Sequence, residues 1–169
     1  MPSAPYPLNR SSSELRFLEL IRGEQTSDEA FERVAQLAIR LGKEPCLVQK
    51  DVEAFVCNRL GYAMYREALH IVESGIADME TVDRASRNAY GLWAALCGPF
   101  RWMDITGGPA LYAQVMKGVF PTLDNTAELP ETMQNMLDAG ASGILDGKGF
   151  YQYKAGDREK WEDLFRESV

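Results

Sequence analysis

The longest run of apolar residues at helical spacing in this chain begins near Asp51 and ends at Gly75. Its members, mostly three to five positions apart, are Phe55, Val56, Leu60, Ala63, Met64, Ala68, Ile71 and Val72. This spacing predicts a helix with one apolar face. Asn58 interrupts the pattern, because asparagine has only mediocre helix propensity. Asn58 is therefore a cap, a surface residue or a residue retained for its amide chemistry.

Shorter patterns of the same kind flank this helix. Thr26 and Glu29 have the spacing of a capping box, so we expect a helix that begins there and stops at Gly42. Its inward face is expected to hold Ala30, Val34, Leu37, Ala38 and Leu41. Further helices are expected from Asp78, from Pro99, from Pro109, over 130–137 and from about Asp157. Only residues 15–21 and 45–48 are typical of extended pieces, so we predict a mostly α chain of about six or seven helices.

Size and charge narrow the class of protein. A length of 169 residues suits one ordinary domain, and 46% hydrophobic with 25% charged residues is typical of a soluble globular protein. The net charge of −7 and the scattered basic residues argue against nucleic-acid binding. No apolar run approaches the roughly 20 residues that cross a bilayer, and no signal-peptide pattern is present. Cys46, Cys57 and Cys97 are expected to be buried free thiols, which favours the cytoplasm or an organelle matrix.

Few residues of this chain can carry chemistry by themselves. His70 is the single histidine, so no metal site of several histidines can be built, and a solvated surface position is expected for it. Cys57 has no nameable base beside it, so a core thiol is expected rather than a nucleophile. The sequence has no glycine-rich nucleotide-binding pattern, and we expect no bound metal. Residues 147–151 either close over a ligand or form a tight turn that docks two aromatic side chains on the core.

Several motifs follow one another in an order and spacing that point to a single family. They are Gly42-Lys43-Glu44-Pro45, Lys50-Asp51, Phe55-Val56, Asn58-Arg59-Leu60, Glu67-Ala68, Glu73-x-Gly75-x-Ala77, Asp83, Gly98-Pro99-Phe100, Asp104 and Gly147-Lys148-Gly149-Phe150-Tyr151-x-Tyr153. This series, over about residues 17–153, resembles the 3-hydroxyacyl-CoA dehydrogenases. Two departures bear on the substrate. Glu53-Ala54 stand where the family usually has Pro-Gly, and Trp93-Ala94-Ala95-Leu96 is more similar to relatives that act on carnitine or sugar acids.

The resemblance implies a fold and a division of the chain. In this family an N-terminal Rossmann domain binds NAD, and a helical C-terminal domain supplies substrate contacts and the dimer interface. The expected fold is mostly α, a multi-helix 6-phosphogluconate-dehydrogenase-C-terminal-like domain built around one long helix, with a short extended segment near the N-terminus. Residues 1–13 are expected to be a flexible tail or linker. Residues 14–50 are expected to be the strand–helix–strand end of a Rossmann domain, and 51–169 the helical substrate-binding and dimerisation domain.

The resemblance also assigns candidate site residues. Asn58 matches the asparagine that holds the substrate's oxygen, and Glu19 matches the glutamate that orients the catalytic histidine. That histidine is expected shortly before Glu19, but residues 6–10 contain none. The serine and the glycine-rich unit are missing too, so NAD is expected in the complete enzyme and not on this chain alone. The competing interpretations are a helix-start cap for Asn58 and a solvated strand residue for Glu19.

Two functions are consistent with these observations. The first is the substrate-binding and dimerisation part of an NAD-dependent 3-hydroxyacyl-CoA dehydrogenase of fatty acid metabolism, which oxidises 3-hydroxyacyl-CoA to 3-oxoacyl-CoA. Such a chain is expected to be inactive alone, either as a fragment of a longer enzyme or as one half of a split enzyme whose Rossmann domain is a separate polypeptide; a carnitine or sugar-acid type hydroxy acid is the alternative substrate. The second is a non-enzymatic helical module that binds an acyl group or a protein partner. Both predict a homodimer that binds neither nucleic acid nor membrane.

Overall fold

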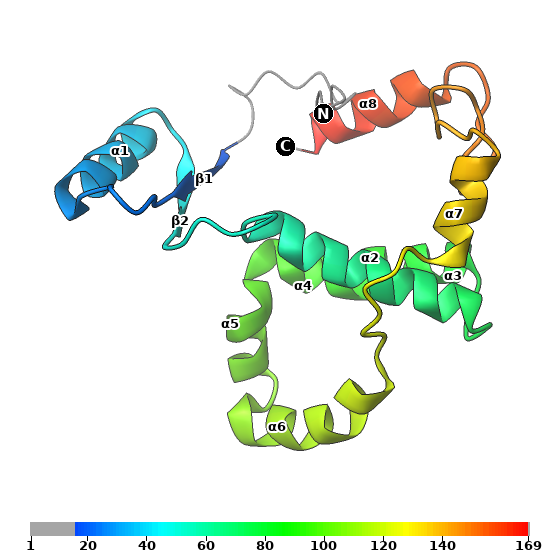
Figure 1. Ribbon diagram of the computed structural model, residues 1–169, viewed down its shortest axis with the longest axis horizontal. Helices are drawn as coiled ribbons and strands as arrows, with labels where there is room; N and C mark the ends of the chain where they lie inside the picture. Colours follow the sequence, from blue (N-terminus) through cyan, green and yellow to red (C-terminus); the bar gives the residue numbers. More distant parts are fainter. Residues whose placement is uncertain (1–15, 169) are drawn as a thin grey trace. The chain divides into compact units, whose positions relative to one another are not determined.

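The computed structural model describes residues 16–168, and most of them are helical (Figure 1). The mostly α fold expected from the sequence is confirmed. The chain divides into two compact units. Of the described residues, one unit comprises 16–61 together with 143–168, and the other runs from Tyr62 to Ser142. The long helix α2 (Cys57–Glu73) gives its first residues to the first unit and the rest to the second.

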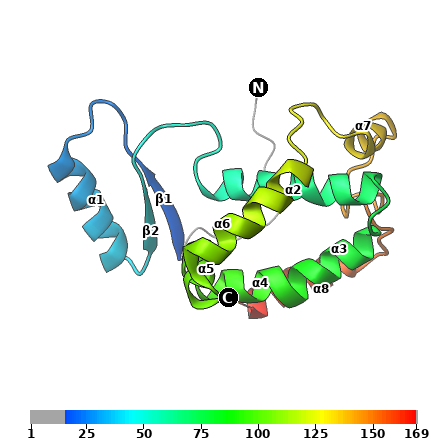
Figure 2. The ribbon, with the colours of Figure 1, turned by 90° about the horizontal axis from the view of Figure 1, so that it is seen from below.

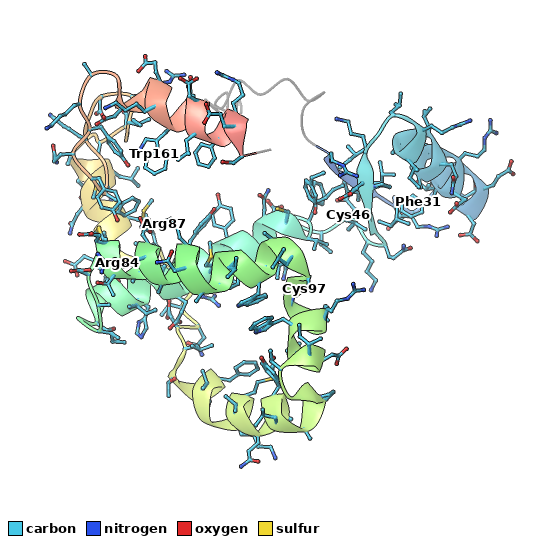
Figure 3. The ribbon with its side chains drawn as sticks, turned by 180° about the vertical axis from the view of Figure 1, so that it is seen from behind. Phe31, Cys46, Arg84, Arg87, Cys97 and Trp161 are labelled. Carbon is cyan, nitrogen blue, oxygen red and sulfur yellow. The ribbon has the colours of Figure 1, made fainter. Side chains whose placement is uncertain are left out.

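The first unit begins with a strand, a helix and a second strand. Strands β1 (Phe17–Ile21) and β2 (Glu44–Val48) pair in parallel, with Glu19 opposite Cys46. Helix α1 (Asp28–Arg40) connects them and lies beside the pair (Figure 2). In the described part of the chain, the buried apolar residues all belong to this segment; they are Phe31, Ala35, Ala38 and Val48. Figure 3 labels Phe31 on α1 and Cys46 on β2.

Helix α1 differs from the expectation at its start and in its buried face. The N-cap is Ser27 rather than Thr26, because the Ser27 Oγ accepts the Ala30 N–H. The Thr26 hydroxyl instead accepts the Gly23 N–H in the preceding turn. The face that packs on the strands holds Phe31, Ala35 and Ala38, whereas Val34, Leu37 and Leu41 are exposed. The two apolar stripes adjoin on this helix and share Ala38, and the stripe that packs on the strands adds the large Phe31 ring and the small Ala35.

The second unit is a series of short helices after α2. They are α3 (Met79–Ala85), the π-helical turn η1 (Ser86–Tyr90), α4 (Gly91–Leu96), α5 (Gly98–Ile105), α6 (Gly108–Val119), the 3₁₀ turn η2 (Phe120–Thr122) and α7 (Glu131–Asp138). As expected, Asp78 caps α3 by accepting the Thr81 N–H, and hydrogen bonding by Thr81 lowers the pKa of the Asp78 carboxyl. Prolines lie in the first turns of α5 and α6. The sequence predicted no helix at α4, because the apolar periodicity breaks there.

Aromatic rings connect η1, α4 and α5. The Trp93 and Trp102 rings stack with their centroids 5.4 Å apart and their planes at 8°. Tyr90 meets the Trp93 ring edge-on, with 4.9 Å between the centroids. Pairs of this kind add about 0.5–1.5 kcal/mol beyond the area that they bury. The chain turns between the two tryptophans at Gly98, whose φ is 70°, so the rings hold the corner between α4 and α5 together (Figure 1).

The glycine-rich segment near the C-terminus forms a tight turn. Lys148 pairs with Gly143 and with Gln152 in antiparallel bridges. A Cβ atom on Gly149 would lie 2.9 Å from the Gly143 Cα, so only glycine fits there. The Phe150 side chain is 45% exposed and therefore does not dock on a core as one interpretation expected. Helix α8 (Asp157–Glu167) follows. Within residues 16–168 no helix combines the length and apolar character needed to cross a bilayer.

Candidate functional site

Glu19 lies in the middle of β1, and its side chain reaches the start of α2. Its Oε1 atom accepts two backbone hydrogen bonds, from Val56 N at 2.9 Å and from Cys57 N at 3.0 Å. Cys57 is the first residue of α2, so the carboxylate meets the N-terminal end of the helix. Glu19 is half-buried, which differs from the alternative prediction of a solvated strand residue.

This contact is favourable for two physical reasons. The first N–H groups of any helix have no partner within the helix, and a side-chain acceptor that satisfies them stabilises its start. The helix dipole also places partial positive charge at this end, where a carboxylate is attracted. Two successive N–H groups converge on one oxygen, as in the backbone nests that hold anions. The sequence resemblance implied that Glu19 orients a catalytic histidine. The structure shows its carboxylate bonded to the Val56 and Cys57 N–H groups.

The chain enters α2 through a turn with unusual backbone angles. Ala54 and Phe55 have φ values of 64° and 48°, in the left-handed region. This conformation costs an L-residue roughly 1–2 kcal/mol, and glycine adopts it freely. Phe55 therefore precedes the helix, and Val56 does too, whereas the sequence pattern had placed both on the helical face. Ala54 occupies the position at which the resemblance leads one to expect glycine.

We expect Ala54→Gly to raise the free energy of unfolding by about 0.5–1 kcal/mol. Glycine removes the left-handed strain of roughly 1–2 kcal/mol, and the more flexible unfolded chain offsets part of that gain. Urea denaturation followed by circular dichroism measures the change. Ala63→Gly inside α2 is the matched control, and it should lower the same free energy by about 1 kcal/mol. Equal destabilisation by both substitutions would contradict the strained turn.

Asn58 is the second residue of α2 and is exposed. In the described part of the chain, its side-chain amide has no hydrogen-bond partner. The alternative role, a cap at the helix start, does not fit this geometry. Asn58 lies inside the helix, and the N–H groups of Val56 and Cys57 bond to Glu19 instead. The structure thus brings the two predicted site residues to the same helix start, with the Asn58 amide presented on the surface.

Two thiols border this region. Cys46 lies opposite Glu19 in the strand pair and is exposed rather than buried as expected. Loss of some of its hydration raises the pKa of the Cys46 thiol, and the nearby Glu19 carboxylate raises that pKa further. A thiol with a raised pKa is a weaker nucleophile at neutral pH, because the thiolate is the reactive form. Cys57 is a free thiol next to Asn58, but it is exposed rather than part of a core as expected.

The strand–helix–strand segment has the topology of a nucleotide-binding unit without the chemistry for one. Its first turn of helix carries Asp28 and Glu29, whose carboxylates would repel a pyrophosphate. Two cations near this turn, Arg22 and Arg33, are paired with Asp28 and Glu29. The connecting loop has a single glycine, Gly23, and not the series of glycines that allows backbone to approach a pyrophosphate. NAD does not fit this unit. Among residues 16–168 no three His, Cys, Asp or Glu side chains converge as metal ligands.

Two glutamates of α2 also accept backbone N–H groups from distant segments, as Glu19 of β1 does. Glu67 accepts the Asp124 N–H at 2.9 Å, and Glu73 accepts the N–H of Thr132 in the first turn of α7 at 2.7 Å. The sequence resemblance included both glutamates without a role. No local pattern could have revealed these contacts, because each joins residues more than fifty positions apart. His70 is half-buried rather than solvated, with Nδ1 3.4 Å from the Ser74 hydroxyl.

Comparison with known proteins identifies the family. The family described as "3-hydroxyacyl-CoA dehydrogenase, C-terminal domain" matches residues 55–153, which is more than half of the chain. The chain belongs to this family. The matched range includes Asn58 and the closing turn, while Glu19 lies before it. The resemblance found in the sequence motifs is therefore confirmed at the level of the family, and a dehydrogenase domain is supported.

The relatives that this chain matches are named for different dehydrogenase activities. An L-carnitine dehydrogenase of Oceanobacillus iheyensis is 37% identical over 132 residues, which are 76% of this chain and 43% of that protein. A 5-formyl-3-hydroxy-2-methylpyridine 4-carboxylate 5-dehydrogenase of Mesorhizobium japonicum is 32% identical over 136 residues, 80% of this chain and 44% of that protein. The chain thus spans less than half the length of these two relatives.

Solved structures agree with the fold of this domain. The crystal structure of 5-formyl-3-hydroxy-2-methylpyridine 4-carboxylic acid 5-dehydrogenase, described as an NAD⁺-dependent dismutase, superposes with a TM-score of 0.86 at 28% identity. The match covers 91% of this chain and 50% of that one. The (S)-3-hydroxybutyryl-CoA dehydrogenase of Ralstonia eutropha gives a TM-score of 0.59 at 31% identity, over 84% of this chain and 49% of that one.

Proposed function

We propose that this chain is the substrate-binding part of an NAD-dependent dehydrogenase that oxidises the alcohol carbon of a hydroxy acid or its thioester. The observation that carries the proposal is the exposed Asn58 amide at a helix start whose leading N–H groups bond to Glu19. The family match supports a dehydrogenase, and the relatives support NAD as the cofactor of the complete enzyme. Alone, the chain is proposed to be inactive.

Asn58 is proposed to hold the substrate's reacting oxygen. Its Nδ2–H₂ group is an uncharged donor, so it can bond to the oxygen both before and after oxidation. A donor fixed in the first turn of a long helix needs little reorganisation when charge develops on that oxygen. The amide is exposed and does not bond to neighbouring residues in the described chain, so a ligand does not have to displace an internal partner.

Glu19 is proposed to orient a histidine that another part of the enzyme contributes. Both hydrogen bonds that Glu19 accepts within residues 16–168 end on Oε1. A carboxylate has a second oxygen with its own lone pairs, so Oε2 can accept an imidazole N–H at the same time. NAD⁺, when bound, would supply the acceptor for the hydride of the alcohol carbon. We propose that its binding residues lie in the part of the enzyme that corresponds to the uncovered half of the relatives.

A small, carnitine-type hydroxy acid is the favoured substrate class, in place of the acyl-CoA thioester expected first. The support is the L-carnitine dehydrogenase of Oceanobacillus iheyensis, which is 37% identical over 76% of this chain. Trp93, in the segment that is similar to carnitine and sugar-acid relatives, packs between Tyr90 and Trp102. The test uses an active fusion of the N-terminal part of the Oceanobacillus iheyensis L-carnitine dehydrogenase to this chain. NAD⁺ reduction by this fusion enzyme is measured with L-carnitine, L-gulonate and (S)-3-hydroxybutyryl-CoA in parallel. Highest kcat/KM on the thioester would reverse this assignment.

A homodimer is proposed from the apolar surface of the second unit. Phe100 is 80% exposed and Leu96 is 79% exposed, and Leu92, Ile105 and Leu111 are at least half exposed. These residues lie on α4, α5 and α6. Monomeric soluble proteins rarely expose large contiguous apolar patches, and we propose that these side chains form such a patch and that it is the association surface. The same surface would support the second candidate function, a non-enzymatic helical homodimer that binds an acyl group or a protein partner.

Leu96→Glu is expected to dissociate the homodimer, because a buried unpaired carboxylate at the interface is costly. Sedimentation velocity should show a dimer for the unmodified chain and a monomer for the variant at the same concentration. Lys117→Glu on α6 changes charge in the same direction and should leave the dimer intact. A monomer in the unmodified chain, or a dimer in Leu96→Glu, would remove this surface as the interface.

A further inference from the structure

We infer that Glu19 is a positioning residue for Asn58: its carboxylate determines where α2 begins and thereby where the Asn58 amide is presented. The inference rests on the proposed function for the role of Asn58, but its geometry does not. One carboxylate oxygen accepts the N–H groups of Val56 and Cys57 at 2.9 and 3.0 Å. We call these two hydrogen bonds to Glu19 the clip. Asn58 is the next residue, so the clip and the Asn58 amide are adjacent along the helix.

The strand that carries Glu19 provides a firm support. β1 is paired along its whole length with β2, and Arg22 N continues the ladder to Val48 O at 2.8 Å. Val48 and the facing side of α1 form the buried core of this segment. A carboxylate on such a strand has a fixed origin, unlike one on a free loop.

The segment between β2 and α2 needs this support. Residues 49–56 have no regular secondary structure, and near their end Ala54 and Phe55 have left-handed backbone angles. Besides its covalent connection, the start of α2 is held by the Glu19 hydrogen bonds and by a contact from Arg59 Nη1 to Glu53 O at 3.4 Å. Without Glu19, the first turn of α2 loses the charged acceptor for two N–H groups and should fray.

Glu19 thereby joins two tasks in one side chain. Through Oε1 it holds the helix start that presents the substrate-binding amide, and through Oε2 it is available to the histidine that the proposed function places beside it. Loss of the carboxylate would affect both groups together. The two tasks separate by chemistry, because a glutamine side chain retains a carbonyl oxygen that accepts N–H groups but lacks the negative charge that stabilises an imidazolium.

The test is amide hydrogen exchange, measured by NMR on the full 169-residue chain. Glu19→Ala should lower the protection of the Val56 and Cys57 amides about tenfold or more, as expected when a hydrogen bond to a charged acceptor is lost. Glu19→Gln should restore most of that protection. Glu24→Ala, a carboxylate in the turn before α1, should change neither amide. Unchanged protection in Glu19→Ala, with the same fold by circular dichroism, would overturn the inference.

A second readout separates this inference from the proposed function. In the active fusion enzyme, Glu19→Ala and Asn58→Ala should be non-additive in kcat/KM, because the part of the Glu19 effect that passes through Asn58 is already lost when Asn58 is replaced. If Glu19→Ala lowers the protection of the Val56 and Cys57 amides but Asn58→Ala leaves the activity unchanged, the clip is supported and the proposed function is rejected. If Asn58→Ala abolishes activity but Glu19→Ala leaves the protection unchanged, the proposed function is supported and the clip is rejected. Full additivity of the two substitutions would reject positioning through Glu19.

Discussion

Asn58→Ala is expected to lower kcat/KM of the complete enzyme by about 10²–10³-fold, the usual effect of removing one donor that stabilises developing charge on a reacting oxygen. The loss should appear in kcat more than in KM, because the interaction strengthens as the oxygen gains charge. The enzyme to measure is a fusion of the N-terminal part of the Oceanobacillus iheyensis L-carnitine dehydrogenase to this chain, assayed by NAD⁺ reduction. That part supplies what the chain does not cover.

Two controls accompany the Asn58 substitution. Asn58→Asp keeps the shape but replaces the donor by a negative charge, so it should lose at least as much activity. Asn125→Ala changes another exposed asparagine, in the loop after η2, and should leave kcat/KM within about twofold of the parent. A fully active Asn58→Ala enzyme would show that this amide is a surface residue without a part in the reaction.

Phe31→Ala is expected to lower the free energy of unfolding of the β1–α1–β2 segment by about 3 kcal/mol, at the low end for phenylalanine truncation in a core. Phe31 is 9% exposed and is the largest of the buried apolar residues in the described chain. The Arg22 guanidinium also lies over its ring, 5.5 Å from the centroid, which adds a cation–π attraction. Alanine would remove both the ring contacts and the platform for the cation.

Thermal and urea denaturation, with amide exchange of α1 as a local probe, measure this loss. Leu41→Ala is the matched control, because Leu41 is 68% exposed and its truncation should cost less than about 0.5 kcal/mol. The comparison also tests which apolar stripe of α1 faces the sheet. A larger effect at Leu41 than at Phe31 would support the face expected from the sequence and contradict the structure.

The starts of the short helices α3, α5 and α6 were the most predictable part of this molecule. Asp78, Pro99 and Pro109 act locally, since each fixes backbone angles or a hydrogen bond within its own turn. The buried face of α1 was less predictable, because two apolar stripes adjoin and only the partner strands decide between them. The start of α2 was misplaced for a related reason. Phe55 and Val56 continue the apolar spacing, but the left-handed angle of Phe55 excludes it from the helix.

The candidate site shows the same division. Asn58 and Glu19 could be named from motifs, because the resemblance carries them position by position. The hydrogen bonds from Val56 and Cys57 to Glu19 join residues 37 and 38 positions apart, and no local spacing encodes such a contact. Those contacts explain why Asn58 does not serve as the cap of α2. The clip is therefore a property of the folded chain, visible only when β1 and α2 are placed together.

This chain is proposed to hold the substrate's oxygen for a dehydrogenase whose NAD-binding residues lie outside it. The most direct test of this claim is NAD⁺ reduction with L-carnitine by the chain alone and by the fusion enzyme at equal concentration, with (S)-3-hydroxybutyryl-CoA and L-gulonate in parallel. Circular dichroism and NADH fluorescence first establish that both proteins are folded and that the fusion binds the cofactor. We predict background rates for the chain alone and turnover well above background for the fusion. Turnover by the chain alone, or a folded, NADH-binding fusion inactive on all three substrates, would contradict the claim.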